Sequence, residues 1–258
     1  MRRDNAPVGN QQKLLKNVRE VQARIGAAAA RSGRDPAEVT MVAVTKEVGV
    51  AVASLLPGIG ILDLGENRIQ GAERKVAGAP ADIRWHMIGH LQRNKAQKAL
   101  AIFSLIHSVD SERLLARLAK LGVEHDRKHE RREVKVLLQV NISAEPQKHG
   151  IEPDALKDFL SQAAGYANVE VLGLMGMGPF AVDPETCRPL FRGLRELRDE
   201  ANAGGWYRAP LAELSMGMTN DFEVAVEEGA TLLRIGTALF TGLDPDEPGS
   251  LARPSEEQ

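Results

Sequence analysis

The sequence predicts an α/β protein, a single (β/α)8 TIM barrel preceded by one extra helix. Eight short apolar runs of the kind found in buried parallel strands alternate with longer helical patterns along the chain. The length of 258 residues suits eight such units, and a hydrophobic content of 43% supports one large core. An open, doubly wound sheet would use the same alternation, so the repeat leaves that fold as an alternative.

The first element is an amphipathic helix over residues 10–31. Apolar side chains recur there at spacings of four, three and four, at Leu14, Val18, Val21 and Ile25, and the segment SGRD then ends the pattern. We expect this apolar face to pack on the barrel. The alternative is that the helix offers a contact surface to a partner protein.

The strands and helices that follow are short and closely spaced. The expected strands are residues 39–45, 60–65, 83–89, 103–109, 134–140, 169–175, 212–217 and 232–236. Helical patterns between them include residues 67–78, 110–122, 153–165, 184–204 and 219–229. We therefore expect one domain over residues 1–243 and a disordered tail over residues 244–258.

Composition excludes several classes of function. The formal net charge is −2, from 33 basic and 35 acidic residues, which gives no reason to expect nucleic acid or an anionic membrane as a partner. No run approaches the roughly 18 apolar residues of a membrane span. The single cysteine, Cys187, fits a reducing compartment, so we expect a cytoplasmic protein.

Two cations are expected to face the inside of the barrel at the ends of its first and last strands. Alternation places Val42, Val44 and Lys46 on one side of the first strand. The same spacing joins Arg234 to Gly236 in the last strand. Apolar walls and a second cation favour the neutral form of a lysine, which can attack an aldehyde. The alternative is that Lys46 is a solvated charge at a strand end.

Small residues after the last two strands suggest a phosphate site. Ser215 with Gly217, and Gly236 with Thr237, can present N–H groups and hydroxyls to a phosphate at the usual place in this architecture. A phosphate clamp together with Lys46 describes a site for pyridoxal 5'-phosphate (PLP).

The histidines do not suggest a metal site. His86 and His90 are about 13 Å apart in an extended strand, too far to share a metal unless the chain turns between them. His107 has no second ligand nearby in the sequence and is expected at a strand end.

Several motifs, in order, resemble the pyridoxal-phosphate homeostasis protein family. They are VAVTK, LGENRIQGA, WHMIGHLQRNK, VLLQVNISAEPQKHGI, GLMGMG and LSMGMTNDFEVAVEEGATLLRIGTALFTG, from Val42 to Gly242. The resemblance implies a fold type III barrel, like the N-terminal domain of alanine racemase, that holds PLP as a covalent aldimine on Lys46.

The resemblance also assigns the other contacts. It gives Ser215, Gly236 and Thr237 to the phosphate and Arg234 to the pyridine nitrogen, and it places Asn67 and His90 at positions that line the pocket. Asn141 and Met175 join the expected site because they lie at inward-pointing strand ends. An arginine at the pyridine nitrogen disfavours its protonation, which weakens the ring as an electron sink.

The chain departs from the family pattern near the lysine. Glu47, Val48, Gly49 and Val50 follow Lys46 where the family often has threonine or lysine and then proline, and leucine stands before GEN where phenylalanine is usual. Alternation predicts that Glu47 points away from Lys46.

We expect a cofactor carrier or regulator with little or no turnover. Alanine racemase adds a β domain and uses a tyrosine opposite its lysine, whereas 22 residues follow Gly236 here, and Tyr166 and Tyr207 fall before strands six and seven. The alternatives are a PLP-dependent racemase or decarboxylase of amino acids, a barrel aldolase that uses Lys46 on its substrate, or a regulator that binds a partner protein. PLP-dependent enzymes are conceivable partners, and a monomer is expected because the dimerising domain is missing.

Overall fold

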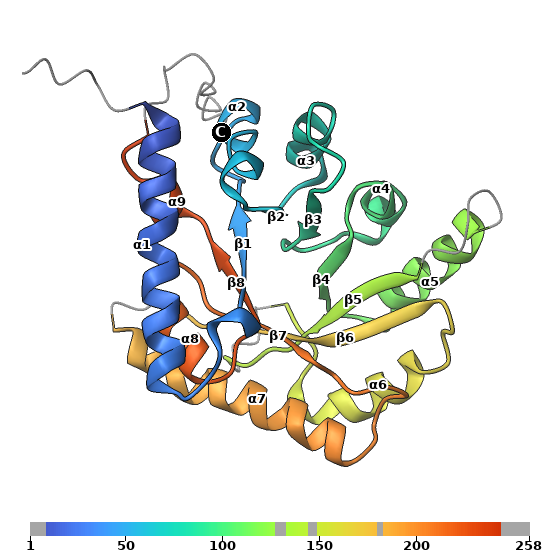
Figure 1. The fold of residues 1–258 in the computed structure, drawn as a ribbon. Helices are drawn as coiled ribbons and strands as arrows, with labels where there is room; N and C mark the ends of the chain where they lie inside the picture. Colours follow the sequence, from blue (N-terminus) through green and yellow to red (C-terminus); the bar gives the residue numbers. More distant parts are fainter. Residues whose placement is uncertain (1–8, 127–132, 144–148, 180–182, 244–258) are drawn as a thin grey trace, which may run out of the picture.

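The chain folds into a closed barrel of eight parallel strands. A computed structural model describes residues 9–126, 133–143, 149–179 and 183–243. Each strand pairs with its neighbours in sequence, and β1 closes the barrel on β8 (Figure 1). Val42 lies opposite Arg234 in this last pairing. The strands are β1 (Thr40–Val44), β2 (Asp63–Glu66), β3 (Arg84–Met87), β4 (Leu105–Val109), β5 (Val134–Gln139), β6 (Val169–Met175), β7 (Glu213–Ser215) and β8 (Leu232–Ile235). The closed barrel is confirmed, and the open doubly wound sheet is excluded.

Helices surround the barrel, as the sequence pattern predicts. They are α1 (Asn10–Arg31), α2 (Val50–Ala53), α3 (Ile69–Val76), α4 (Ala96–Ile102), α5 (Glu112–Asp126), α6 (Leu156–Ala163), α7 (Arg188–Ala203), α8 (Phe222–Glu227) and α9 (Thr237–Phe240). Short 3-10 turns lie at Pro36–Glu38, Pro57–Ile59, Arg93–Lys95, Pro153–Ala155 and Pro184–Cys187. Helices α2, α4 and α9 are four to seven residues long, too short for a clear periodic pattern in the sequence.

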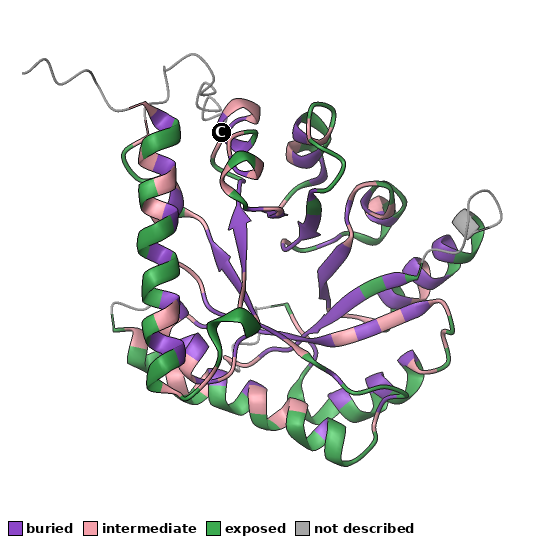
Figure 2. Cartoon of the chain, in the orientation of Figure 1, coloured by how far each residue is buried: buried purple, intermediate pink, exposed green. Residues whose placement is uncertain are grey.

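Two apolar layers hold the barrel together. The larger layer lies between the strands and the helices, and the strands are buried along nearly their whole length (Figure 2). The smaller layer fills part of the barrel interior and consists of Val42, Leu105, Leu137, Met175 and Leu232. Because Val42 and Leu232 lie in this interior layer, the side of β1 and β8 that the alternation predicted to face inward does so.

Helix α1 covers the side of the barrel where the chain closes. It spans the residues predicted from its periodicity, and the residues of its apolar stripe, including Leu14 and Val18, are buried. The helix packs against α8 and α9 (Figure 1). The side chain of Asn17 donates hydrogen bonds of 2.9 Å to the carbonyls of Leu239 and Thr241. The prediction that this helix packs on the barrel is confirmed.

Helix α8 is held from both sides by ion pairs. From α1, Arg31 contacts Glu227 at 2.6 Å, and from α7, Arg188 contacts the same carboxylate at 2.6 Å. Arg192 of α7 pairs with Glu228 at 3.0 Å, and the Glu228 side chain is 5% exposed. These contacts, together with the buried Phe222, fix the helix that follows β7.

Some expectations lie outside the described residues. The tail over residues 244–258 is among them. None of the helices that the structure describes combines the length and apolar character needed to cross a membrane.

Leu14→Ala should destabilise the protein by about 2 to 5 kcal/mol, because it removes a fully buried side chain from the contact of α1 with the barrel. Chemical denaturation measures this loss. Lys16→Ala, on the exposed face of the same helix, is the control and should change the free energy of unfolding by less than about 0.5 kcal/mol. Equal effects of the two changes would show that α1 does not stabilise the barrel.

Candidate functional site

A cavity of about 690 Å³ lies at the carboxyl ends of the strands, where barrel proteins place their ligands. Its lining comes from seven of the eight strands, either from the strand itself or from the loop that follows it. Six of the nine residues expected at the site line it, namely Lys46, Asn67, His90, Arg234, Gly236 and Thr237. The structure therefore brings the two cations and part of the expected phosphate clamp together.

Lys46 reaches the cavity from the end of β1. Val44 and Lys46 both line the cavity, as the alternation predicts, and the lysine side chain is 46% exposed. The prediction that Glu47 points away is wrong, because its Oε1 lies 3.8 Å from Lys46 Nζ. The strand ends at Val44 and the chain turns at these residues, so alternation no longer holds. The carboxylate of Glu47 is 79% exposed, and water screens this pair.

Arg234 supplies a buried positive charge at the base of the cavity. The residue is 4% exposed, and its guanidinium donates hydrogen bonds to Ser215 Oγ at 2.7 Å and to the carbonyl of Gly176 at 3.0 Å. Burial lowers the pKa of Arg234 to about 10, against an opposing effect of the nearby Asp221. Arg234 therefore remains charged at neutral pH.

A chain of hydrogen bonds runs from Arg234 through the barrel interior. Ser215 Oγ lies 2.8 Å from His107 Nδ1, and His107 Nε2 lies 2.8 Å from His86 Nδ1. His86 Nε2 in turn lies 3.0 Å from Asp63 Oδ1. The five side chains come from β8, β7, β4, β3 and β2, so the chain of contacts crosses the barrel.

The expectation that His107 sits at a strand end is wrong. It is the third residue of β4, is fully buried, and contacts both His86 and Ser215. Burial, and then the neighbouring His86 and Arg234, lower the pKa of His107 well below its usual value. His107 is therefore neutral at neutral pH. His86 faces the interior while His90 lines the cavity, so the two do not share a ligand site.

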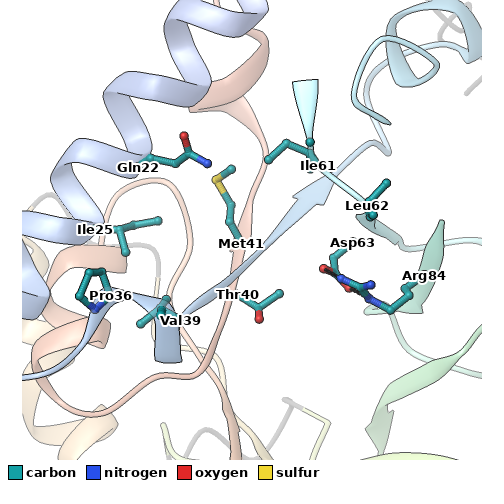
Figure 3. Close-up of a pocket in the computed structure, with 12 residues that line it drawn as sticks. Gln22, Ile25, Pro36, Val39, Thr40, Met41, Ile61, Leu62, Asp63 and Arg84 are labelled. Carbon is teal, nitrogen blue, oxygen red and sulfur yellow. Dashed lines mark hydrogen bonds and ion pairs between the residues drawn. The ribbon is translucent and has the colours of Figure 1, made fainter. Parts of the chain in front are cut away.

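Asp63, the last residue of this series of hydrogen bonds, borders a second cavity of about 450 Å³ at the amino ends of the strands. Figure 3 shows the Asp63 carboxylate and the Arg84 guanidinium side by side on its wall. Arg84 donates to both oxygens of Asp63, at 2.7 and 2.5 Å. Burial alone would raise the pKa of Asp63, but the hydrogen bonds from His86 and Arg84 outweigh it and lower that pKa to about 2.

The loops after β7 and β8 face each other across one side of the cavity. Thr219 and Asn220 of the first loop and Gly236 and Thr237 of the second line it. Thr219 Oγ1 accepts a hydrogen bond of 3.4 Å from the Ala238 N–H, which ties the two loops together. These loops can present N–H groups and hydroxyls to an anion.

Gly217 and Asp221 set the shape of the first of these loops. Gly217 has φ of +90°, and a Cβ there would lie 2.5 Å from the Cβ of Ala225 in α8. Asp221 Oδ1 accepts a hydrogen bond of 2.5 Å from the Met218 N–H. The loop therefore requires a glycine at its start and a short acceptor side chain at its end.

Three expected site residues are not among those that line the cavity. Ser215 is fully buried beneath Arg234, with its hydroxyl between Arg234 and His107. Met175 belongs to the interior apolar layer. The Asn141 side chain donates a hydrogen bond of 3.1 Å to Glu152 Oε1.

His90, Asp110 and His149 form a cluster at the mouth of the cavity that has the donor types of a metal site. Their ligand atoms lie within 4.8 Å of one another, and His90 Nδ1 is 3.2 Å from Asp110 Oδ2. The imidazole rings are stacked, with centroids 3.9 Å apart and planes 14° from parallel. Lone pairs of nearly parallel rings run side by side, so the rings would have to rotate before both could bind one metal ion.

Sequence reasoning missed other residues that line the cavity, among them Gln139, His149, Thr219 and Cys187. Inward alternation along β5 could have found Gln139, since Leu137 faces the interior. Cys187 lies in the 3-10 turn before α7 and is buried at 1% exposure. No local pattern distinguishes such loop residues, because the path of the loop brings them to the cavity.

The fold and the cavity define a single (β/α)8 barrel whose main cavity at the carboxyl ends of the strands is lined by a lysine, a buried arginine and two loops of small residues. The model of the alanine racemase N-terminal domain family matches residues 10–244. The chain is 40% identical over 218 residues to a pyridoxal phosphate homeostasis protein of Aquifex aeolicus, covering 84% of this chain and 92% of that one. It is 37% identical over 238 residues to the protein of that name from Pseudomonas aeruginosa, covering 92% and 99%.

A solved structure agrees with these relatives. PipY of Synechococcus elongatus PCC7942, with PLP bound, is 33% identical, covers 88% of this chain and 99% of its own, and superposes with a TM-score of 0.75. The chain belongs to the alanine racemase N-terminal domain family and, within it, to the pyridoxal phosphate homeostasis proteins.

Asp63 should make the stability depend on pH between about 4 and 2. Its folded pKa of about 2 lies below its ordinary value of 3.8, so its contribution is present above pH 4 and is lost as the pH falls through 2. The loss should amount to about 2 kcal/mol. Urea unfolding of the wild type and Asp63→Asn across this range measures it, and the variant should lack this component. The exposed Asp158→Asn is the control, and a wild-type slope in Asp63→Asn would contradict the assignment.

Proposed function

We propose that this chain binds PLP covalently through Lys46, as a Schiff base, and serves intracellular PLP homeostasis with little or no catalytic turnover. The observation that carries the proposal is that Lys46 and the buried Arg234 line one cavity with the two loops after β7 and β8. The names of the relatives, and PipY with PLP bound, support it.

The residues present fit the chemical groups of PLP. The amine of Lys46 would condense with the aldehyde, with loss of one water molecule. The phosphate would lie between the loops, against Gly236, Thr237 and Thr219. Thr219 takes the role first expected of Ser215, because Thr219 lines the cavity and the Ser215 hydroxyl is engaged below Arg234.

Arg234 would face the pyridine nitrogen. The bound cofactor supplies an aldehyde and an electron-withdrawing ring. Because Arg234 keeps its proton at neutral pH, it would donate a hydrogen bond to the nitrogen without protonating it. A ring with an unprotonated nitrogen is a weaker electron sink, which suits a carrier better than an enzyme that makes carbanions.

The tyrosines support low turnover. Tyr207 lies before β7, and its hydroxyl donates a hydrogen bond of 3.1 Å to the carbonyl of Val169 at the start of β6. Tyr166 precedes β6. Neither lines the cavity, whereas a racemase needs an acid/base group on each face of its substrate. We further propose that the protein acts as a monomer in the cytoplasm and that PLP-dependent enzymes are candidate recipients of its cofactor.

Lys46→Ala should abolish covalent binding of PLP. The wild type mixed with PLP should show a visible absorbance band, and borohydride reduction should leave the adduct on the peptide that contains Lys46. Lys98→Ala, an exposed lysine that pairs with Glu73, is the matched control and should bind as the wild type does. Absence of the band in the wild type after PLP is added, or an adduct on another lysine, would overturn the proposal.

Turnover can be tested directly on the PLP-loaded protein. With L-alanine, L-lysine or L-ornithine as substrate, we expect a turnover rate below about 1% of the median enzyme rate of roughly 10 per second. Chiral chromatography measures racemisation, and release of CO2 measures decarboxylation. Turnover at enzyme-like rates would instead support the racemase or decarboxylase alternative. His90→Gln, His149→Gln and Cys187→Ala would then show which of these cavity-lining groups carries the proton.

A further inference from the structure

The hydrogen-bonded chain beneath Arg234 has a direction that the donors themselves determine. Arginine has N–H donors and no acceptor, so Ser215 Oγ must accept from Arg234 at 2.7 Å. The hydroxyl of Ser215 has one proton, and His107 Nδ1 lies 2.8 Å away. If His107 Nδ1 accepts that proton, its Nε2 carries the ring proton in the neutral imidazole.

The position of the proton on His107 also determines the hydrogen bonds that lead to Asp63. In that arrangement His107 Nε2–H donates to His86 Nδ1, 2.8 Å away, which leaves the single ring proton of His86 on Nε2. His86 Nε2–H then donates to the carboxylate of Asp63 at 3.0 Å. In this arrangement each contact from Arg234 to Asp63 joins one donor to one acceptor, and each imidazole carries a single proton. This series of hydrogen bonds begins at the cation of Arg234 and ends at the anion of Asp63.

The opposite direction is costly. If His107 Nδ1 carried the proton, Ser215 Oγ would accept from both His107 and Arg234. The serine proton would then have no acceptor among the contacts of the described residues, in a fully buried position. His86 would also need protons on both nitrogens to contact His107 and Asp63, which would bury another cation. Burial of His107, which lowers its pKa, favours the neutral arrangement.

We propose that His107 and His86 are positioning residues. Together with Asp63 they fix the hydroxyl proton of Ser215 on the side of His107, so that Ser215 Oγ accepts a hydrogen bond from Arg234. This contact orients the guanidinium toward the ring nitrogen of the cofactor. Arg234 is held at two points, Ser215 Oγ and the Gly176 carbonyl, and these leave three of its five N–H groups for a ligand. This inference rests on the proposed function, since it assigns Arg234 to the pyridine nitrogen. Recognition of the ring would then also depend on the carboxylate of Asp63, at the opposite end of the barrel.

The first test needs no cofactor. Nitrogen-15 NMR of the imidazole groups in the PLP-free protein at pH 7 should show two neutral histidines with the proton on Nε2. His86→Asn and His107→Gln assign the two sets of signals. A proton on Nδ1 of His107, or a doubly protonated His86, would overturn the proposed direction.

The second test measures recognition of the ring nitrogen. We compare the affinity of PLP with that of its 1-deaza analogue, in which carbon replaces the ring nitrogen and the aldehyde and phosphate are kept. A hydrogen bond from a charged donor should give the wild type at least about a tenfold preference for PLP. In His107→Phe the serine hydroxyl is free to turn, and the preference should fall to about threefold or less.

Controls separate positioning from general damage. Tyr207→Phe removes a different buried hydroxyl outside the barrel interior and should keep the wild-type preference even if the protein is less stable. Asp63→Asn retains an oxygen acceptor and should keep both tautomers and the preference, whereas Asp63→Leu should lose them. If His107→Phe does not fold, Asp63→Leu gives the same readout from the other end.

The outcomes also distinguish this inference from the proposed function. If neither compound forms an adduct on Lys46 of the wild type, the proposed function fails. If both form the adduct and the tenfold preference persists in His107→Phe and Asp63→Leu, the proposed function stands and the positioning role is overturned.

Discussion

The buried guanidinium of Arg234 is the constraint on which the interior of this barrel depends. Among the described residues its side-chain contacts are a hydroxyl and a carbonyl, not a carboxylate within ion-pair distance, and burial alone would make the charge costly. The side chains that lie between it and Asp63 offset this cost by their hydrogen bonds. Four other strands each contribute one polar side chain to this chain of contacts, while five apolar side chains fill other parts of the interior.

The outer helices serve the same site from the opposite side of the sheet. Helix α8 follows the loop that carries Thr219, and a Cβ on Gly217 would collide with this helix. Ion pairs from α1 and α7 hold α8, while Asn17 of α1 bonds to the backbone at the end of α9. The extra helix at the start of the chain therefore supports both loops proposed to hold the phosphate.

The sequence predicted the elements well because their signals are local. Period-two alternation fixed which side of β1 and β8 faces inward, and this placed Lys46 and Arg234 correctly in one cavity. The position of Glu47 could not be predicted, because alternation fails once the strand ends. His107 was misjudged for a different reason: its partners, His86 and Ser215, lie 21 and 108 residues away, and only closure of the barrel brings them together.

The chain of hydrogen bonds also links the two faces of the barrel, which usually have separate roles. In this architecture the amino ends of the strands contribute to stability and the carboxyl ends to function. Asp63 lies at an amino end, where its pairing with Arg84 and His86 lowers its pKa and contributes to stability. In the proposed arrangement the same carboxylate accepts the last hydrogen bond of a series that begins at Arg234, and it sets the direction of every hydrogen bond in between. A residue that contributes to stability at one end of the barrel would therefore determine how the proposed ligand is held at the other.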